Sequence, residues 1–162
     1  MSDVAVEFEL NGHVHYGVVP ANIVLVDYLR DTCGLHGARI GCSRGVCGAC
    51  TVLIDGRPVA ACSTFTFQVD GAKVTTIEGL DAGGKLDPVQ QAFIDNAAFQ
   101  CGYCTPGMIL LTKALLAHEP SPDRATIVDW ISSNVYRCAG YPQIIAAVED
   151  AARRTRTRGA GA

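Results

Sequence analysis

Seven of the chain's eight cysteines fall into two groups, and the spacing of the first group suits a metal cluster. Cys42, Cys47 and Cys50 are separated by four and two residues, and Cys62 follows after a short predicted hairpin. Four thiolates with this plant-type spacing hold a [2Fe–2S] cluster, which carries one electron at a time. The first group therefore predicts a protein that transfers electrons.

Glycines separate the cysteines of the first group, in the stretch 41–50. A loop that wraps a cluster needs positive φ angles at some positions and backbone N–H groups that point at the sulfur atoms. Structural zinc on four cysteines is the competing interpretation, but the spacing and the glycines favour iron and sulfide. A Rieske centre would need two histidine ligands. We expect all four histidines to be ordinary surface or loop residues: His13, His15, His36 and His118.

The second group lies in the last third of the chain and contains Cys101, Cys104 and Cys138, with Tyr136 close to the last of them. These residues fall in two turns, and each turn directly precedes a predicted helix. Unpaired N–H groups and the macrodipole at a helix N-terminus favour negative charge, so we expect lowered thiol pKa values there. If two such helix pairs pack side by side, both N-termini point at one place, where a second cluster would fit.

The composition suits a globular protein with no nucleic-acid partner. The 162 residues are 49% hydrophobic and 18% charged, and the formal net charge is −3. No apolar run approaches the ~20 residues that cross a bilayer, and the N-terminus lacks the features of a signal peptide. We therefore expect a cytoplasmic protein without membrane attachment. In that compartment, Cys-x2-Cys pairs are more typical of metal sites than of disulfides.

The first half of the chain has the pattern of strands. An Asn-Gly pair at 11–12 and an Asp-Gly pair at 55–56 are strong hairpin signals between apolar segments. The predicted strands cover residues 4–10, 14–19, 51–54, 57–60 and 73–77. Apolar residues at helical spacing predict a helix over 22–30. This order predicts a plant-type ferredoxin-like β-grasp domain over residues 1–78.

The second half is predicted to be helical, which makes the whole chain an α+β protein. A glycine-rich linker over 79–85 leads into it. The predicted helices begin near residues 87, 105, 121 and 142, and the first runs to residue 99. We predict a C-terminal four-helix bundle domain over 84–155, followed by a flexible tail over 156–162.

The motifs that carry these cysteines resemble those of the small iron–sulfur subunits of the molybdenum hydroxylases, the family of xanthine oxidase and aldehyde oxidoreductase. The resemblance covers nearly the whole chain. Its main stretches are residues 27–30, 41–52, 61–63, 75–79, 100–108 and 137–141.

The resemblance implies two [2Fe–2S] clusters in this chain and two partner subunits. The outer cluster, on the first cysteine group, would face a medium FAD-binding subunit, with Arg44 and Val46 as candidate contacts. The inner cluster, on the second group and position 136, would lie beside the molybdopterin of a large catalytic subunit. Gln100 and Cys138 would approach the pterin. The assembly would be a dimer of heterotrimers.

Position 136 departs from the family pattern, which usually reads Cys-Arg-Cys where this chain reads Tyr136-Arg137-Cys138. Four outcomes are open. In the first, the Tyr136 phenolate ligates iron. In the second, water or a group from a partner chain fills the open position. In the third, Cys33 fills it, and in the fourth, the inner cluster is labile or missing. The ring of Tyr136 would otherwise simply pack between helices. For Cys33 we expect packing as a small hydrophobic residue rather than a ligand role.

The leading hypothesis is an electron-transfer subunit that relays electrons from a molybdenum site through two clusters to a flavin. Such a chain would supply no catalytic acid, base or nucleophile of its own. The alternatives are a freestanding ferredoxin, which leaves the helical half without a purpose, and a structural subunit with an impaired inner cluster.

Overall fold

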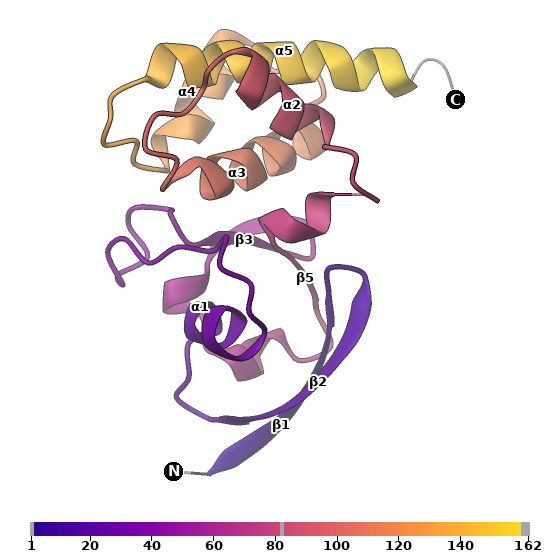
Figure 1. The fold of residues 1–162 in the computed structure, drawn as a ribbon, viewed down its shortest axis with the longest axis vertical. Coiled ribbons are helices and arrows are strands. Elements are labelled where there is room, and N and C mark those ends of the chain that lie inside the picture. The colour runs from indigo at the N-terminus through magenta and orange to yellow at the C-terminus, as the bar shows by residue number, and fades with distance from the viewer. Residues whose placement is uncertain (1, 82, 160–162) are drawn as a thin grey trace.

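The computed structural model describes residues 2–81 and 83–159, and it consists of a sheet half and a helical half. The sheet half covers residues 2–80 and the helical half covers residues 88–159. In Figure 1 the two halves stack end to end, with the chain's N-terminus at the foot of the sheet half and the helices α2 to α5 at the opposite end. The expectation of a mixed α+β protein is confirmed.

Within residues 2–81 and 83–159, five strands form one sheet in the order β2-β1-β5-β3-β4. The strands are β1 (Asp3–Leu10), β2 (His13–Pro20), β3 (Thr51–Ile54), β4 (Arg57–Ala60) and β5 (Lys73–Thr75). β1 and β5 run parallel, and the other neighbours are antiparallel. Both predicted hairpins are present. Their turns have positive φ angles at both central residues, as type I′ turns require: Asn11 (52°), Gly12 (84°), Asp55 (49°) and Gly56 (78°).

The helix predicted over 22–30 is shorter than expected and changes type. It consists of α1 (Leu25–Asp27), followed directly by a π-helical turn, η1 (Tyr28–Thr32). Its apolar side chains nevertheless face the core, where Leu25, Val26 and Leu29 are buried. Three 3-10 turns complete this half: η2 (Ala61–Ser63), η3 (Thr66–Val69) and η4 (Ile77–Leu80).

The four predicted helices are present in the helical half, as α2 (Pro88–Asp95), α3 (Thr105–His118), α4 (Arg124–Ser132) and α5 (Tyr141–Gly159). Aspartates cap two of them: Asp87 accepts a hydrogen bond from Val89 N, and Asp123 accepts one from Thr126 N. Helix α2 ends before its predicted limit at Phe99, because Ala97 has a left-handed conformation (φ 48°). Among the described helices, none combines the length and apolar character that spanning a bilayer requires.

Helix α5 extends beyond its predicted end, so residues 156–159 of the predicted tail are helical. Arg154 stabilises this end of the helix through ion pairs to Asp95 (2.7 Å) and Asp150 (2.6 Å). The first pair ties α5 to α2, and the second lies within α5 itself. Residues 160–162 of the predicted tail lie outside the described residues.

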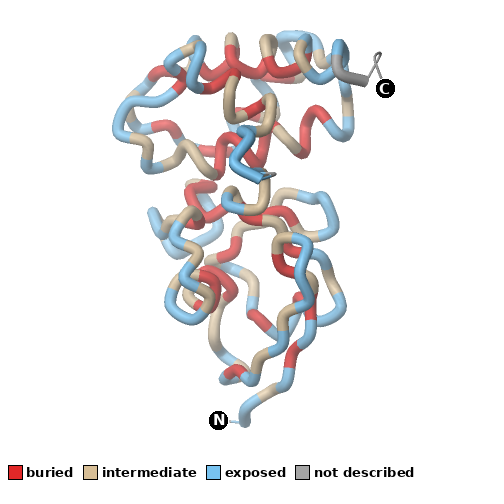
Figure 2. The backbone as a smooth tube through the Cα atoms, turned by 45° about the vertical axis from the view of Figure 1, so that its right-hand side comes forward, coloured by how far each residue is buried: buried red, intermediate tan, exposed pale blue. Residues whose placement is uncertain are grey.

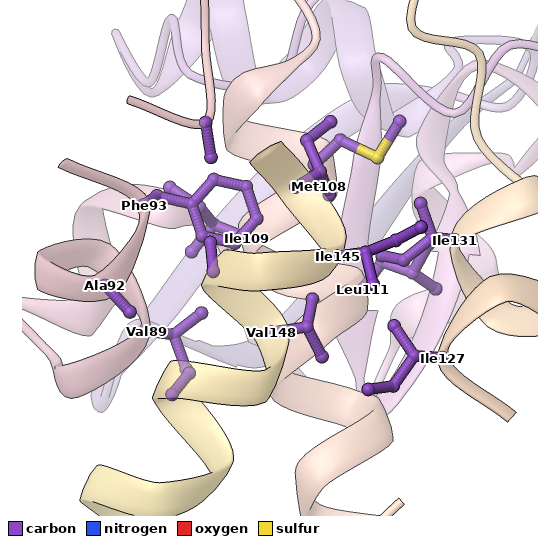
Figure 3. Close-up of a cluster of buried hydrophobic side chains, with 14 of the residues drawn as sticks. Val89, Ala92, Phe93, Met108, Ile109, Leu111, Ile127, Ile131, Ile145 and Val148 are labelled. Atoms are coloured by element: carbon purple, nitrogen blue, oxygen red, sulfur yellow. The ribbon is translucent and has the colours of Figure 1, made fainter. Parts of the chain in front are cut away.

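Each half has its own hydrophobic core, as the two groups of buried residues in Figure 2 show. In the sheet half, Phe8, Leu25 and Leu29 are among the largest fully buried side chains. In the helical half, α2, α3, α4 and α5 surround one core, which Figure 3 shows in close-up. Its labelled members are Val89, Ala92, Phe93, Met108, Ile109, Leu111, Ile127, Ile131, Ile145 and Val148.

The two halves meet where α3 packs on β3. Leu53 of β3 forms a small buried cluster with Leu110 and Ala114 of α3. Beside it, the buried side chain of Asn134 donates hydrogen bonds to the Gly48 carbonyl (3.3 Å) and to Thr51 Oγ1 (3.4 Å). Gly48 has a φ of 69°, and a Cβ atom there would collide with the Asn134 side chain. The contact therefore requires glycine at position 48 for two separate reasons.

We predict that Gly48→Ala destabilises the full chain more than the matched variant Gly56→Ala. Both glycines have positive φ angles, but a Cβ atom at Gly56 meets nothing within 4 Å. The excess should be about 1–3 kcal/mol, because Asn134 would lose its buried hydrogen-bond partners. Urea unfolding of the two variants measures it. Equal midpoints would contradict the importance of this junction.

Candidate metal centres

The first cysteine group converges in one loop of the sheet half. Cys42, Cys47 and Cys50 lie between η1 and β3, and the β3–β4 hairpin brings Cys62 in η2 back to them. Backbone N–H groups point at the sulfur atoms. Cys42 Sγ accepts from Arg44 N and Cys47 N (both 3.4 Å), Cys62 Sγ accepts from Gly45 N (3.2 Å), and Cys50 Sγ accepts from Cys62 N (3.4 Å). This arrangement stabilises negative charge on sulfur.

The electrostatic environment differs between the two ends of this loop. Hydrogen bonds from the backbone N–H groups of Cys47, Val46 and Arg44 lower the pKa of Cys42 to about 6. Burial raises the pKa of Cys50 to about 12, and this residue is only 2% exposed. Burial therefore disfavours the thiolate of Cys50, whereas the backbone N–H groups favour the thiolate of Cys42.

The second cysteine group converges at the end of the helical half, as its helix N-termini predict. Cys101 and Cys104 lie in the loop before α3, and Cys138 lies in the loop before α5. The Sγ atoms of Cys101 and Cys138 are 3.6 Å apart. Tyr136 belongs to the second loop and is 4% exposed. Burial raises the pKa of its phenol, the thiols of Cys138, Cys104 and Cys101 add to that shift, and a hydrogen bond with the Gln100 side chain opposes it.

The expected lowering of the thiol pKa is found for Cys101, in the loop before α3. The N–H of Tyr103 and the Cys138 side chain lower the pKa of Cys101. The expectation is wrong for Cys104, although Cys104 is the N-cap residue of α3. Burial raises its pKa, and the neighbouring thiols of Cys101, Cys138 and Cys47 add to that shift. Desolvation therefore outweighs the helix terminus at this position.

Both sets of residues fit [2Fe–2S] chemistry, in which bridging sulfides leave two protein ligands for each iron. Two thiolates on one tetrahedral metal at about 2.3 Å lie about 3.8 Å apart, close to the observed separation of 3.6 Å between Cys101 and Cys138. The first group also interacts in pairs, Cys42 with Cys47 and Cys50 with Cys62. Within residues 2–81 and 83–159, no group of three His, Cys, Asp or Glu side chains is arranged to hold a single metal ion.

The two sites are joined directly through the backbone. Val135 N donates a hydrogen bond of 2.9 Å to the carbonyl of Cys47. Val135 precedes Tyr136, so this bond connects a residue of the first cysteine group with the loop of the second. Sequence reasoning missed the bond, because nothing in the local pattern around Val135 indicates a partner so far away in the chain.

Arg39 is a second functional residue that sequence reasoning missed. Its guanidinium lies over the Tyr103 ring, 5.3 Å from the ring centroid, and its positive charge contributes to the lowered pKa of Cys101. Tyr103 Oη in turn donates to the carbonyl of Ile40 (2.9 Å). A cation from the sheet half therefore lies beside the cysteines of the helical half.

The remaining candidate residues fall in two places. Gln100 is exposed next to Cys101, and its Nε2 donates to the Cys138 carbonyl (3.2 Å). Cys33 packs against the core of the sheet half, as expected, and its Sγ atom contacts His15 Nε2 at 3.7 Å. His15 is partly buried and bonded to Tyr28 Oη (2.8 Å), so it is not the ordinary surface residue that we expected.

Two family models match the chain, one for each site. A model described as "2Fe-2S iron-sulfur cluster binding domain" matches residues 33–99, which contain the first cysteine group. A second model, described as "[2Fe-2S] binding domain", matches residues 76–149, which contain the second group.

Curated relatives and solved structures match nearly the whole chain. The nicotinate dehydrogenase small FeS subunit of Eubacterium barkeri is 44% identical over 154 residues, which cover 95% of this chain and 98% of the relative. Quinoline 2-oxidoreductase from Pseudomonas putida superimposes with a TM-score of 0.91 at 39% identity, covering 96% of this chain and 97% of the matched chain. An aldehyde oxidoreductase from Desulfovibrio desulfuricans gives the same TM-score at 42% identity, where 94% of this chain matches 17% of a longer one.

We predict that Cys62→Ala removes the iron of the first site, whereas Cys33→Ala leaves the iron content unchanged. Cys62 lies among the other cysteines of its group, while Cys33 packs in the core of the sheet half. Iron and acid-labile sulfide assays on the anaerobically purified variants measure both effects. A full iron complement in Cys62→Ala would contradict the assignment of this site.

We predict that Arg39→Gln lowers the reduction potential of the second site. A nearby positive charge stabilises the additional negative charge of the reduced state, so its loss favours the oxidised state. The shift should be on the order of tens of millivolts, given about 59 mV for each tenfold change in a one-electron equilibrium. Redox titration monitored by EPR measures it. Arg124→Gln is the control, because Arg124 pairs with Glu149 instead (2.8 Å), and equal shifts in both variants would contradict the prediction.

Proposed function

The chain belongs to the small [2Fe–2S] subunits of the molybdenum hydroxylases, and from this membership we propose that it relays electrons from a molybdopterin-binding subunit to an FAD-binding subunit. The observation that carries the proposal is the hydrogen bond between Val135 N and the Cys47 carbonyl, because it connects two cluster-binding loops within one chain. A relay needs two sites that lie close together in space, and this bond holds the two loops together.

The ligands of the outer cluster are Cys42, Cys47, Cys50 and Cys62, and Cys101, Cys104 and Cys138 belong to the inner cluster. Each cluster, when bound, supplies a carrier for a single electron. The protein's contribution is to hold the ligands, to direct N–H groups at their sulfur atoms and to keep the two sites at a fixed separation. Arg39 adds a positive charge beside Cys101 of the inner site.

Two exposed surfaces suit the two partner subunits. At the outer loop, Arg44 is exposed and Val46 is 65% exposed, so this tip is the candidate contact for the medium FAD-binding subunit. At the inner site, Gln100 and Cys101 are exposed, and Cys138 is partly exposed. We assign Gln100 and Cys138 to the approach of the pterin on the large molybdopterin-binding subunit.

The finer architecture follows from the same proposal. We assign the sheet half to a plant-type ferredoxin-like β-grasp domain over residues 1–78 and the helical half to a four-helix bundle domain over 84–155. The complex would be a dimer of heterotrimers. Its localisation in the cytoplasm stays a prediction.

Neither alternative function accounts for the comparisons as well. A freestanding ferredoxin has no use for the helical half, which forms the second [2Fe–2S] binding domain. The matched relatives include named subunits of larger enzymes, such as the nicotinate dehydrogenase small FeS subunit. A purely structural subunit would not need the N–H groups that point at the outer thiols.

The proposal is tested by purifying the tagged full chain together with its native partners under anaerobic conditions. We expect a large molybdopterin subunit and an FAD subunit to copurify. A panel of N-heterocycles and aldehydes, the compound classes on which the named relatives act, then serves as candidate reductants. A substrate of the complex should reduce both clusters and then the flavin. Purification of the chain alone, with no partner, would contradict the proposal.

In the same complex, we predict that Cys62→Ala separates the two steps of the relay. The inner cluster should still be reduced by substrate, because its ligands lie on other loops, but the flavin should stay oxidised. Stopped-flow absorbance and freeze-quench EPR distinguish these events, and Cys33→Ala is the control that should behave as wild type. Flavin reduction at the wild-type rate in Cys62→Ala would contradict the proposed direction of electron flow.

A further inference from the structure

We infer that Asn134, in the loop between α4 and α5, is a positioning residue of the outer cluster. Its side chain holds the backbone between Cys47 and Cys50, and this backbone shapes the electrostatic environment in which the outer cluster is reduced. This role rests on the proposed function, because it presupposes that the two cysteines are ligands of a cluster. It gives the helical half a part in tuning the site of the sheet half.

All four backbone carbonyl groups of the stretch 47–50 accept hydrogen bonds, and the helical half donates to the first two. The Cys47 carbonyl accepts from Val135 N (2.9 Å), and the Gly48 carbonyl accepts from Asn134 Nδ2 (3.3 Å). The next two carbonyls bond N–H groups of the sheet half: Arg39 N (3.1 Å) and Ala61 N (3.3 Å). The helical half therefore holds the two peptide groups that directly follow Cys47.

Gly48 does not fix its own conformation. Its φ is 69°, and glycine adopts positive and negative φ angles about equally well because it has no Cβ atom. Asn134 supplies the restraint from outside, since its side chain packs so closely on Gly48 that a Cβ atom there would collide with the amide group. Gly107 of α3 lies against the Gly48 carbonyl, where a Cβ atom on Gly107 would collide with the oxygen. The backbone after Cys47 is therefore held by contacts from another part of the chain.

The direction of these two carbonyls matters because it also sets the direction of two N–H groups. In a trans peptide group the C=O and N–H bonds point in opposite directions, and none of the described peptide bonds is cis. The carbonyls of Cys47 and Gly48 face the helical half, so the N–H groups of Gly48 and Ala49 point away from it. In the assigned role, these N–H groups add to those already directed at the outer sulfur atoms. N–H groups near a cluster stabilise its more negative, reduced state.

Thr51 extends the same contact to the residue that follows Cys50. Its hydroxyl group donates to the Gly48 carbonyl (2.7 Å) and accepts from Asn134 Nδ2 (3.4 Å), and its backbone N–H donates to the same carbonyl (3.1 Å). Asn134 and Thr51 are both 5% exposed. Asn134 therefore closes a buried set of hydrogen bonds that spans the backbone from Gly48 to Thr51. An apolar side chain would fill this space without the cost of burying an amide.

The test is a redox titration of the purified complex, monitored by EPR, in which the two clusters are followed separately. Asn134→Ala should lower the reduction potential of the outer cluster, because the freed backbone no longer keeps its N–H groups in place. We expect a threefold to tenfold change in the one-electron equilibrium, roughly 30–60 mV at about 59 mV for each tenfold change. The inner cluster should keep its potential, because the backbone carbonyl of residue 134 still accepts from Tyr141 Oη (3.4 Å).

Asn96→Ala is the matched control. Asn96 Nδ2 also donates to a backbone carbonyl, that of Ala92 (2.9 Å), and to a second acceptor, Asp150 (3.1 Å). Both partners lie in the helical half, so this variant loses an equivalent amide without touching the outer site, and both potentials should stay at their wild-type values. An equal shift of the outer cluster in Asn96→Ala, or equal shifts of both clusters in Asn134→Ala, would indicate a general loosening of the fold and would overturn the positioning role.

Two variants of Thr51 decide the question if Asn134→Ala fails to fold or loses its iron. Thr51→Val keeps the size of the side chain but removes the hydroxyl group and its two hydrogen bonds, so it should also lower the potential of the outer cluster. Thr51→Ser keeps the hydroxyl group and should titrate like wild type. Equal outer potentials in the valine and serine variants would contradict the role of this hydrogen-bond set.

Failure of the positioning role and failure of the proposed function give different results. A wild-type outer potential in Asn134→Ala, in a complex whose substrate still reduces both clusters, overturns the positioning role alone. A wild-type complex that shows only the outer cluster by EPR overturns the two-cluster relay, and the titration of that outer cluster still decides the role of Asn134.

Discussion

The hydrogen bond from Val135 N to the Cys47 carbonyl is the interaction on which the arrangement of the two sites depends. Other contacts hold the same two loops in place around it. Asn134 donates to the Gly48 carbonyl, and Leu53 packs on α3 close by. The carbonyl therefore belongs to a packed interface rather than to a flexible linker. The loops that carry the cysteines themselves make this interface, so these contacts join the two sites directly.

The sequence predicted those parts of the fold that short segments determine by themselves. The Asn-Gly and Asp-Gly pairs specify hairpin turns through their own φ angles, and Asp87 and Asp123 cap helices through bonds two or three residues away. The failures occur where distant contacts decide the outcome. Asn96, at the end of α2, donates to Asp150 of α5 (3.1 Å), and Arg154 of α5 pairs with Asp95 of α2. No pattern within one segment reveals such partners.

The same distinction applies to the candidate sites. Three of the outer cysteines lie within one short stretch, so their spacing alone indicates a common site, whereas the inner group is recognisable only if two helix pairs are assumed to pack together. Arg39 and Asn134 could not be found in this way, because Arg39 acts on a cysteine of the other half and Asn134 bonds Gly48 across 86 residues of sequence. The wrong expectation for Cys104 has a related cause. Its helix position is local information, but its burial depends on the whole fold.

The inner site is built in a way that tolerates a change at position 136. Its cysteines are held independently, with Cys104 at the N-cap of α3 and Cys138 just before α5, and both helices are anchored in a shared core. A substitution at position 136 therefore leaves in place the elements that hold Cys104 and Cys138. The outer site has less independence, because backbone N–H groups of its own loops bind its sulfur atoms. Cys47 N donates to Cys42 Sγ, Gly45 N donates to Cys62 Sγ, and Cys62 N donates to Cys50 Sγ. A bulky residue at an outer position would disturb several of these bonds at once, so a departure from four cysteines is physically easier to accommodate at the inner site.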